Sequence, residues 1–367
     1  MQFTCSTKPL SNALDLGVVN QNVSKFYQKS CLAQVTASSK ELKINLEAAN
    51  VLSEIRLKGS GDTDQTVTIF VDCLLLKQLV STFDAAVTAF EFTEGGLILH
   101  SGKSKFTLPK MIDGSELELT SPSDDEAETV IDIDKSDWKF IKEHQMYAIA
   151  MSFIHPVYTR VWVGQDGDVL VGDFDNSMFT HSKKSKLGST CLLSDTIINL
   201  FNTLPEGAKL RKLANSYVIK VSTDGYEYMS EFKPIYESEE GVGSYNSDII
   251  LEMMVKDEAN GLKVNTNVIN KFLNQAALLS NSTEDTIKFT VRDGNIGLVD
   301  NNVDCKVPVE GITEAYEVEF KTVLLKAVIS NFDEETVTIS PMKQDDVVAG
   351  IIVWSKNMTV VLAGIDE

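Results

Sequence analysis

A similar segment recurs three times along the chain, at intervals of about one third of its length. Each copy ends an amphipathic stretch with an apolar residue and leads into a strand-like stretch; the three apolar markers are Phe83, Leu204 and Phe332. The markers lie 121 and 128 residues apart in a chain of 367 residues. This interval is too long for a solenoid built from repeats of 20–50 residues. Three copies of one domain would account for the whole length, and chance similarity among short apolar helix ends is the alternative explanation.

Each third carries two helix signals. Apolar residues spaced i, i+3, i+4 and i+7 mark one face of a helix before each marker. These residues are Leu76, Leu79, Val80 and Phe83, then Ile197, Leu200, Phe201 and Leu204, and, in a weaker form, Leu324, Ala327, Val328 and Asn331. Each third also has an earlier predicted helix. In the first third it covers residues 8–17, in the second it follows an N-cap at Asp134 or Ser136, and in the last it follows an N-cap at Asn265. The apolar stripe of that last helix is predicted to consist of Val268, Phe272, Ala276 and Leu279.

Most of the remaining sequence indicates antiparallel strands. Strand-like pairs flank the turn signals Glu94-Gly95-Gly96, Asp166-Gly167, Asp224-Gly225 and Asp293-Gly294. Units of about 120 residues with two helices and several hairpins are typical of an α+β fold, with helices on one face of antiparallel sheet. The polar, acidic stretches 121–128 and 236–244 lack apolar periodicity and suit linkers. We therefore expect three domains, at residues 1–122, 123–247 and 248–367.

The cysteines and the N-terminus bear on the cellular compartment. Five cysteines are scattered singly along the chain, which excludes C-x-x-C zinc and redox motifs and suits a reducing cytosol. The first residues lack a basic region followed by an apolar run, and no apolar stretch is long enough to span a bilayer. The sequence predicts a soluble cytoplasmic protein without a membrane segment.

Motifs for catalysis and metal binding are mostly missing. The sequence has no nucleotide-binding glycine loop, no paired histidines at zinc spacing and no nucleophile elbow. The best metal candidate combines Asp166 and Asp168 with Asp173 and Asp175. A calcium loop counted from Asp173 lacks the required Gly and the bidentate Glu. We therefore expect solvated carboxylates here, with no metal, no cofactor and no catalytic residue.

Basic residues are informative because acidic ones outnumber them, giving a net charge of −20. Lys135, Lys139 and Lys142 fall at i, i+4 and i+7, on one face of the predicted helix after Asp134. Like charges at this spacing cost a helix a few tenths of a kcal/mol. Scattered surface lysines are the alternative, but a basic surface on the helices would bind DNA phosphates without reading sequence. Other basic residues near the predicted helices include Lys77, Lys209, Arg211, Lys271 and Lys321.

Local sequence resembles the bacterial DNA polymerase III beta sliding clamps, the processivity factors of DNA replication. Residues 97–108, Leu-Ile-Leu-His-Ser-Gly-Lys-Ser-Lys-Phe-Thr-Leu, resemble that family's first-domain strand, Leu-Val-x-Ser-Gly-Arg-Ser-Arg-Phe-x-Leu. Residues 272–281, Phe-Leu-Asn-Gln-Ala-Ala-Leu-Leu-Ser-Asn, resemble its third-domain helix, Phe-x-x-Ala-x-Ile-Leu-Ser-Asn. The start, Met1-Gln2-Phe3-Thr4, is similar to the family's Met-Lys-Phe-Thr. The resemblance spans the chain and implies three domains of the clamp fold in a non-enzymatic protein.

The resemblance implies a head-to-tail homodimer that closes as a ring, with helices lining a central hole and sheets outside. It places Phe106 and Leu108 of one chain against Leu278 and Leu279 of the other, although the two leucines could instead belong to an intradomain core. A ring holds double-stranded DNA by topology, so a negative net charge is no obstacle. The resemblance also implies DNA contacts at Tyr158 and Arg160, and at Lys25 or Lys29.

The family's partners, the replicative DNA polymerase and the clamp loader, insert a short peptide into an apolar pocket between the second and third domains. Carried over, that pocket would involve Val163, Asp173, Asp175, Asn176, Met178, Val360 and Leu362. The family's Thr-Asp-Gly-His-Arg stretch and its Met-Pro-Met-Arg-Leu end are both replaced here, which predicts a different peptide specificity. Such divergence suits a clamp encoded by a phage or plasmid.

Two other classes of function remain open from the sequence. One is a nucleic-acid enzyme that would bind Mg²⁺ through Asp166, Asp168, Asp173 and Asp175. The other is a structural assembly protein whose three similar domains form a ring or shell.

Overall fold

The computed structural model describes residues 1–18, 32–48, 51–111, 119–151, 155–235, 244–279, 285–300, 303–311, 314–345 and 347–365. The chain forms two compact units, each described by itself below. The first comprises Met1–Trp138 and Asp195–Pro234, and the second comprises Lys139–Ser194 and Ile235–Glu367. Lys25 and Lys29 lie outside the described residues. The predicted domain boundaries stay a prediction.

One order of elements occurs three times: a strand, a helix, four strands, a helix and three strands. The first copy is β1 (Gln2–Ser6), α1 (Thr7–Val18), β2 (Leu32–Ala37), β3 (Glu41–Ala48), β4 (Val51–Lys58), β6 (Val67–Asp72), α2 (Cys73–Val80), β7 (Val87–Thr93), β8 (Gly96–Ser101) and β9 (Ser104–Pro109), with β5 (Ser60–Gly61) added. The second is β10 (Thr129–Asp132), α3 (Lys135–His144), β11 (Val161–Val163), β12 (Asp168–Asp173), β13 (Met178–Lys183), β14 (Cys191–Leu193), α4 (Asp195–Thr203), β15 (Lys209–Lys212), β16 (Tyr217–Ser222) and β17 (Tyr226–Phe232), with the 3₁₀ turns η2 (Met146–Ala148) and η3 (Pro156–Thr159). The third is β18 (Leu262–Asn265), α6 (Thr266–Leu279), β19 (Thr286–Arg292), β20 (Asn295–Val299), β21 (Asp304–Pro308), β22 (Tyr316–Lys321), α7 (Thr322–Ser330), β23 (Thr336–Gln344), β24 (Val347–Trp354) and β25 (Thr359–Ala363), preceded by α5 (Ser247–Met253). The predicted α+β repeat and all four predicted hairpins are confirmed.

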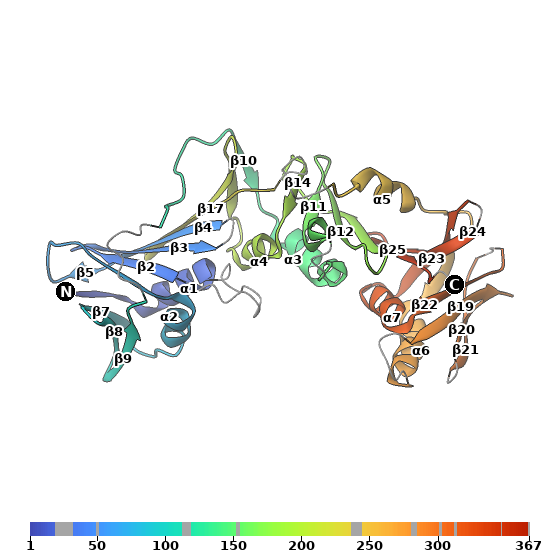
Figure 1. The fold of residues 1–367 in the computed structure, drawn as a ribbon, viewed down its shortest axis with the longest axis horizontal. Helices are drawn as coiled ribbons and strands as arrows, with labels where there is room; N and C mark the ends of the chain where they lie inside the picture. Colours follow the sequence, from blue (N-terminus) through green and yellow to red (C-terminus); the bar gives the residue numbers. More distant parts are fainter. Residues whose placement is uncertain are drawn as a thin grey trace. The chain divides into compact units, whose positions relative to one another are not determined.

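The first unit contains a five-stranded sheet, β5-β1-β7-β8-β9, and an eight-stranded sheet, β10-β15-β16-β17-β4-β3-β2-β6. Helix α1 packs on β4 and β17 and also contacts α2 and α4 (Figure 1). The side chains of Leu46 and Ile55 reach Gly17 of α1 so closely that a Cβ at this glycine would lie 2.8 Å from each of them. The absence of a side chain at Gly17 therefore lets the helix approach the sheet.

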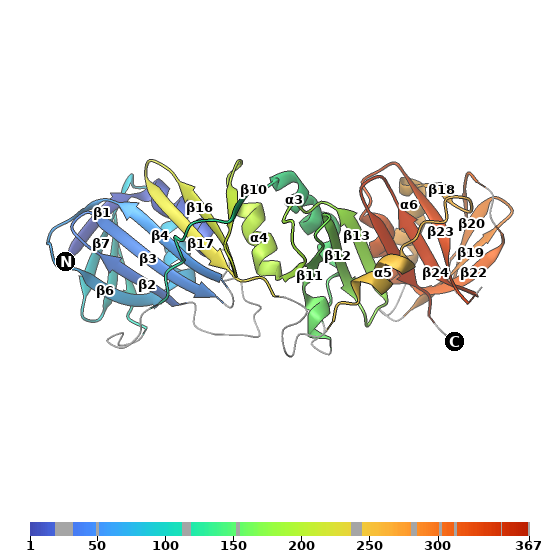
Figure 2. The same cartoon turned by 90° about the horizontal axis from the view of Figure 1, so that it is seen from above.

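The second unit contains an eight-stranded sheet, β14-β11-β12-β13-β25-β24-β23-β18, and a four-stranded sheet, β21-β20-β19-β22. Helix α7 contacts β25 and packs beside α6. Figure 1 shows α5 on the opposite side of the eight-stranded sheet from α7, and in Figure 2 α5 lies in front of this sheet. We call the two sides the α5 face and the α7 face.

Each eight-stranded sheet is formed by two successive copies joined edge to edge. In the first unit, β4 pairs antiparallel with β17, with Val51 opposite Phe232. In the second unit, β13 pairs antiparallel with β25, with Met178 opposite Leu362. In both cases the third strand after a copy's first helix pairs with the last strand of the next copy. Under this rule the strands left at sheet edges are β9 of the first copy and β21 of the third.

The helix starts agree with the sequence, but the buried stripes of two helices do not. The backbone N–H of Ser136 donates to Asp134 Oδ1 at 3.0 Å, and that of Val268 donates to Asn265 Oδ1 at 3.1 Å, so Asp134 and Asn265 cap α3 and α6. The buried apolar residues of α6 are Ile269, Leu273 and Ala276, and those of α7 are Leu325, Val328 and Ile329. Most of the two predicted stripes was therefore wrong, because each helix also carries apolar residues beside its buried face.

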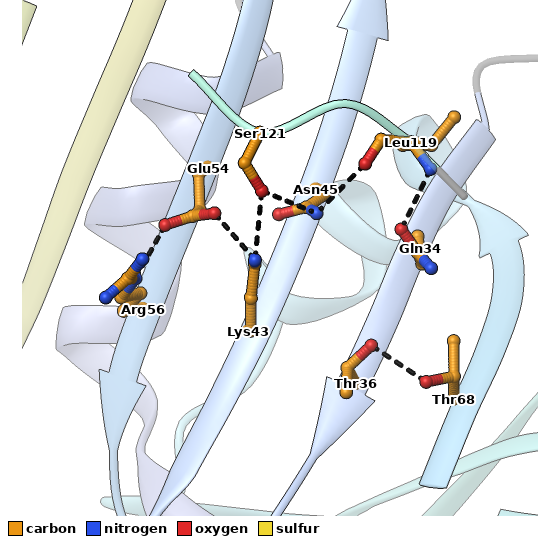
Figure 3. Close-up of polar contacts among 9 residues, drawn as sticks. All are labelled: Gln34, Thr36, Lys43, Asn45, Glu54, Arg56, Thr68, Leu119 and Ser121. Atoms are coloured by element: carbon orange, nitrogen blue, oxygen red, sulfur yellow. Dashed lines mark hydrogen bonds and ion pairs between the residues drawn. The ribbon is translucent and has the colours of Figure 1, made fainter. Parts of the chain in front are cut away.

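The linker segment 119–125 is fastened to the eight-stranded sheet of the first unit, on the side away from α1 (Figure 3). Lys43 Nζ donates to Ser121 Oγ at 3.0 Å, and the Leu119 N–H donates to Gln34 Oε1 at 3.1 Å. Farther along, Arg211 lies 3.1 Å from Asp124 Oδ1 and donates to the Asp125 carbonyl. Part of the linker predicted to be exposed is thus bound to the sheet by hydrogen bonds and an ion pair.

A buried carboxylate lies at the centre of these contacts. Glu54 is within ion-pair distance of Lys43, at 2.8 Å, and of Arg56, at 2.6 Å. Burial raises the pKa of Glu54, but hydrogen bonds from Lys43, Ser121 and Arg56 outweigh it and hold the pKa below the ordinary value. Glu54 is therefore ionised at neutral pH and keeps the two cations in place.

Candidate nucleic-acid and partner interfaces

Three lysines project from one exposed face of α3. Trp138 and Ile141 are buried and fix the orientation of the helix, whereas Lys135, Lys139 and Lys142 are exposed. Lys139 Nζ lies 3.8 Å from Glu143, an exposed ion pair whose expected contribution to stability is below about 1 kcal/mol. The lysines are therefore available to an anionic ligand.

The helices are more basic than the rest of the chain. Apart from α5, the helices of the described chain carry seven lysines and four acidic residues, although the chain has a net charge of −20. The lysines are Lys8, Lys77, Lys135, Lys139, Lys142, Lys271 and Lys326. These helices would therefore attract phosphates more strongly than the rest of the chain does.

Three of the predicted DNA contacts lie on strands instead of helices. Lys209 and Arg211 belong to β15, and Lys321 ends β22. Lys209 shares a cross-strand row with Lys220, Met229 and Glu54, which places it on the sheet face away from α1. Arg211 is already engaged by Asp124.

The two residues predicted from the loop after α3 differ in exposure. Tyr158 is buried, stacks on Phe174 with ring centroids 5.6 Å apart, and donates a hydrogen bond to the Tyr245 carbonyl. A side chain in this position cannot reach a DNA backbone without unfolding its surroundings. Arg160 follows η3 and is half-buried.

The predicted pocket residues divide between a turn and the α7 face. Met178 and Leu362 are cross-strand partners, and Val360 lies opposite Thr180 on the same strand pair. Met178, Val360 and Leu362 are all buried, and they lie on the α7 face because the adjacent Phe179 and Val361 face α5. Val163 is buried as well. These side chains are therefore part of the interior of the unit.

The turn that joins β12 to β13 is organised by Asp173. Its Oδ1 accepts hydrogen bonds from the backbone N–H groups of Asp175, at 3.1 Å, and Asn176, at 3.3 Å. Asn176 Nδ2 donates to Asp173 Oδ2 at 2.7 Å. The short acidic motif therefore shapes a turn whose Phe174 ring points onto Tyr158.

An apolar cluster that the sequence did not reveal covers the α5 face. It is called the α5-face cluster and consists of Ala150, Val157, Tyr158, Trp162, Leu170, Phe179, Leu192, Ile235, Tyr245, Ile250, Met254, Met342, Ile352 and Val361. Ile250 and Met254, at i and i+4 of α5 and its C-cap, press onto the sheet. Their spacing is the signal that could have located α5.

A cavity of about 460 Å³ opens beside this cluster. One wall is Ile249, Met253 and Val255 of α5 and the segment after it. The opposite wall includes Met342 and Ile352 of the sheet. The cavity is an accessible apolar site on this face.

The four residues predicted for the dimer seam differ in how exposed they are. Leu278 and Leu279, at the end of α6, are 84% and 50% exposed, so they do not belong to an intradomain core. Phe106 of β9 is half-buried and stacks on Phe83 at 5.3 Å. Leu108 is fully buried within its unit.

The acidic residues considered for a metal do not form a joint site. Among the described residues, no group of three or more His, Cys, Asp or Glu side chains is placed to hold a metal ion. Asp168 Oδ1 instead accepts a hydrogen bond from His181 Nε2 at 2.7 Å. In the same part of the chain, no helix has the length and apolarity needed to cross a membrane.

Comparison with solved structures identifies the fold. The chain is similar over 100% of both chains to a beta sliding clamp of C. crescentus (15% identity, TM-score 0.78) and to a DNA polymerase sliding clamp of Pseudomonas aeruginosa (13% identity, TM-score 0.75). It covers 99% of a DNA polymerase III beta subunit of Thermotoga maritima, with 100% of this chain aligned, 12% identity and a TM-score of 0.77. No protein-family model and no curated protein matches the sequence. These likenesses confirm the predicted clamp fold.

Proposed function

We propose that this chain is a DNA sliding clamp, a non-enzymatic processivity factor that encircles duplex DNA. The observation that carries the proposal is the pairing rule of the sheets. At both joints within the chain, the third strand after a copy's first helix pairs with the last strand of the next copy. The corresponding strands that remain at sheet edges are β21 of the third copy and β9 of the first copy. A second copy, placed head to tail, would satisfy both edges and close a ring.

The helices beside these edges support the same seam. At the internal joint of the first unit, α1 packs on β4 and β17 and contacts α4, the second helix of the next copy. By the same rule, α6 of one chain would pack on β9 of another and contact its α2. Leu278 and Leu279 lie at the end of α6, while Phe106 lies on β9. We leave Leu108 out of the seam because its side chain faces the interior.

Duplex DNA would be held by the ring and attracted by the helix lysines. The helix residues that we assign to phosphate contact are Lys77, Lys135, Lys139, Lys142 and Lys271. We add Arg160, which directly follows η3 in the loop after α3. Lysines contact phosphates without base recognition, so such contacts permit movement along the duplex. Lys209, Arg211 and Lys321 are left out because they lie on strands.

The partners would be a replicative DNA polymerase and a clamp loader, acting with the clamp in the cytoplasm of a bacterium or of a phage-infected host. In this chain we place partner docking on the α5 face, where the cluster and the cavity lie. Val163, Met178, Val360 and Leu362 would support that face from behind instead of touching a partner.

The test is retention on closed DNA. The clamp is loaded with its cognate loader, or assembled at high protein concentration, on nicked circular duplex, and bound protein is measured by gel filtration before and after linearisation. We expect retention on circles and release from linear DNA, together with a native mass near twice that of one chain. Equal retention on circular and linear DNA, or a mass near three chains, would contradict the proposal.

A further inference from the structure

A shallow hollow of about 700 Å³ opens at one edge of the eight-stranded sheet of the second unit. Residues of β18, β23 and β24 form its floor, and the segment after α5 and the turn between β24 and β25 contribute to its rim. Its β23 residues are Thr336 and Thr338, at the start of the strand, whereas the cavity beside α5 is lined by Pro341 and Met342 farther along. We call this separate place the Trp354 hollow, after the aromatic residue that lines it.

The indole ring of Trp354 lies across the floor of the hollow. Lys263, Thr338 and Trp354 are successive cross-strand partners, so their side chains share one face of the sheet. A Cβ at Gly261 would lie 3.3 and 3.4 Å from two indole carbons and 2.8 Å from Thr338 Cγ2. The ring therefore extends past Thr338 toward the start of the edge strand β18, where Gly261 leaves it room. Trp354 is half-buried and lines the hollow, so part of its π surface remains available to a ligand.

Three exposed lysines surround this ring: Lys256, Lys263 and Lys356. They come from different sides, because Lys256 follows α5, Lys263 lies on β18 and Lys356 lies in the turn after β24. None of the three forms an ion pair with another residue that the structure describes. Their charges are therefore available to an anionic ligand.

Two glutamates also line the hollow but leave its balance positive. Glu334 Oε1 accepts a hydrogen bond from Asn357 Nδ2 at 3.3 Å, which directs this carboxylate toward the turn. Glu310 is the backbone bridge partner of Lys263. Three lysines and two glutamates make a locally basic surface in a chain whose net charge is −20. Such a surface attracts anions that the rest of the chain repels on average.

We propose that the Trp354 hollow binds single-stranded nucleic acid. A base would stack on the indole ring, and the three lysines around it would contact the neighbouring phosphates. An aromatic platform flanked by cations is the combination that binds single strands without reading their sequence. Duplex DNA does not fit this site, because its bases stack on one another and expose no face to the ring. The inference goes beyond the proposed clamp function, since neither ring closure nor the helix lysines take part.

The test uses a thymidine oligonucleotide of about 12 nucleotides and the full chain. Binding is measured by tryptophan fluorescence and by the anisotropy of a labelled oligonucleotide. Trp138 and Trp162 are buried, so quenching by the oligonucleotide reports on Trp354. We expect quenching by the single strand, little quenching by a duplex of the same length, and a slope of log K against log salt of about −2 for three phosphate contacts.

Two sets of variants separate charge from stacking. Changing Lys256, Lys263 and Lys356 together to Glu should abolish binding, whereas changing Lys58, Lys209 and Lys233 to Glu alters the net charge equally and should preserve most of it. Trp354→Leu should weaken binding at least about fivefold, because the base loses its platform, whereas Trp354→Phe should retain most of the affinity. Circular dichroism checks that each variant is folded.

Several results would overturn the inference. These are an absence of quenching, equal binding by the Lys256, Lys263 and Lys356 variant, and equal quenching by the duplex. Equally effective competition by a polyglutamate peptide would assign the hollow to an acidic protein segment instead. The variant with Lys135, Lys139 and Lys142 changed to Glu should bind the single strand normally, and its failure to do so would move the site to α3. Retention on circular DNA is measured separately, so a failure of the clamp function is distinguishable from a failure of this site.

Discussion

Lys43 Nζ lies 2.8 Å from Glu54 Oε2, and the Glu54 side chain is only 1% exposed. Arg56 contacts the other carboxylate oxygen, and Lys43 also donates to Ser121 of the linker segment. One buried anion therefore organises two cations and the chain that crosses them (Figure 3). This arrangement links the stability of the first unit to the protonation state of Glu54.

Replacing Glu54 with Gln should destabilise the first unit by about 1–3 kcal/mol at neutral pH, because the cations lose their buried partner. The pKa of Glu54 is lower in the folded chain than its ordinary value of 4.5. Its stabilisation is thus complete above that value and is lost as the pH falls through the folded pKa. Urea unfolding from pH 7 to pH 3 should show the variant and the unmodified chain converging at the acidic end.

Glu47→Gln on β3 is the matched control, since Glu47 is exposed. It should change the free energy of unfolding by less than about 0.5 kcal/mol. A constant difference between Glu54→Gln and the unmodified chain at every pH would show that Glu54 acts by packing alone.

Changing Lys135, Lys139 and Lys142 together to Glu should weaken binding to linear duplex DNA while preserving the native mass. If each lysine neutralises one phosphate, the slope of log K against log salt should become less steep by about two to three. Fluorescence titrations between 25 and about 200 mM salt measure that slope. Retention on circular DNA at moderate salt should fall less than affinity for linear DNA, because the ring is a topological restraint.

Three exposed lysines on or beside strands of the first unit provide the control for this charge reversal: Lys58, Lys209 and Lys233. Changing them to Glu alters the net charge by the same amount but leaves the helices untouched. An equal loss of DNA affinity in this control would mean that the total charge, and not the helix surface, determines binding.

The sequence predicted elements better than it predicted faces. Hairpins and helix starts were correct because turn glycines and N-caps are local signals. The face of a strand was not predictable where both sides are buried. Val169, Leu170 and Val171 are all buried, as are Val360, Val361 and Leu362. Successive residues of a strand face opposite sides, so an assignment that is wrong by one residue selects the wrong face. The predicted pocket residues Val360 and Leu362 lie on the α7 face, whereas Val361 between them belongs to the α5-face cluster.

The exposed apolar residues explain the remaining errors. Val268 and Leu279 interrupt the pattern of α6 because they lie outside its buried stripe. Ile249 and Met253 similarly conceal the short amphipathic pattern of α5. Leu279 is also assigned to the proposed dimer seam, and Ile249 and Met253 line the cavity on the proposed docking face. These departures from a simple pattern therefore coincide with proposed interfaces.

Tyr158→Phe should separate packing from DNA contact. The variant loses one hydrogen bond to the Tyr245 carbonyl, which costs about 0.5–1.5 kcal/mol, while the ring remains in the α5-face cluster. Thermal unfolding should show a decrease of about 2–4 °C. DNA affinity should be unchanged, whereas Arg160→Ala should lower it. A loss of affinity in Tyr158→Phe as large as that in Arg160→Ala would instead make Tyr158 a DNA contact.

Leu278→Asp with Leu279→Asp should convert the proposed dimer to a monomer. Both leucines are exposed in the single chain, so the substitutions remove nothing from its core, but they would place two carboxylates in an apolar seam beside Phe106. Burying an unpaired charge costs several kcal/mol, enough to shift the dimer dissociation constant by at least about a hundredfold. Light scattering across protein concentration should show the mass fall from two chains to one, with the circular dichroism unchanged. Val347→Asp, also at an exposed apolar residue but on β24, should keep the dimer. A double variant that stays dimeric would refute the seam at α6 and β9, and a Val347→Asp variant that dissociates would move the seam to the β23–β24 hairpin.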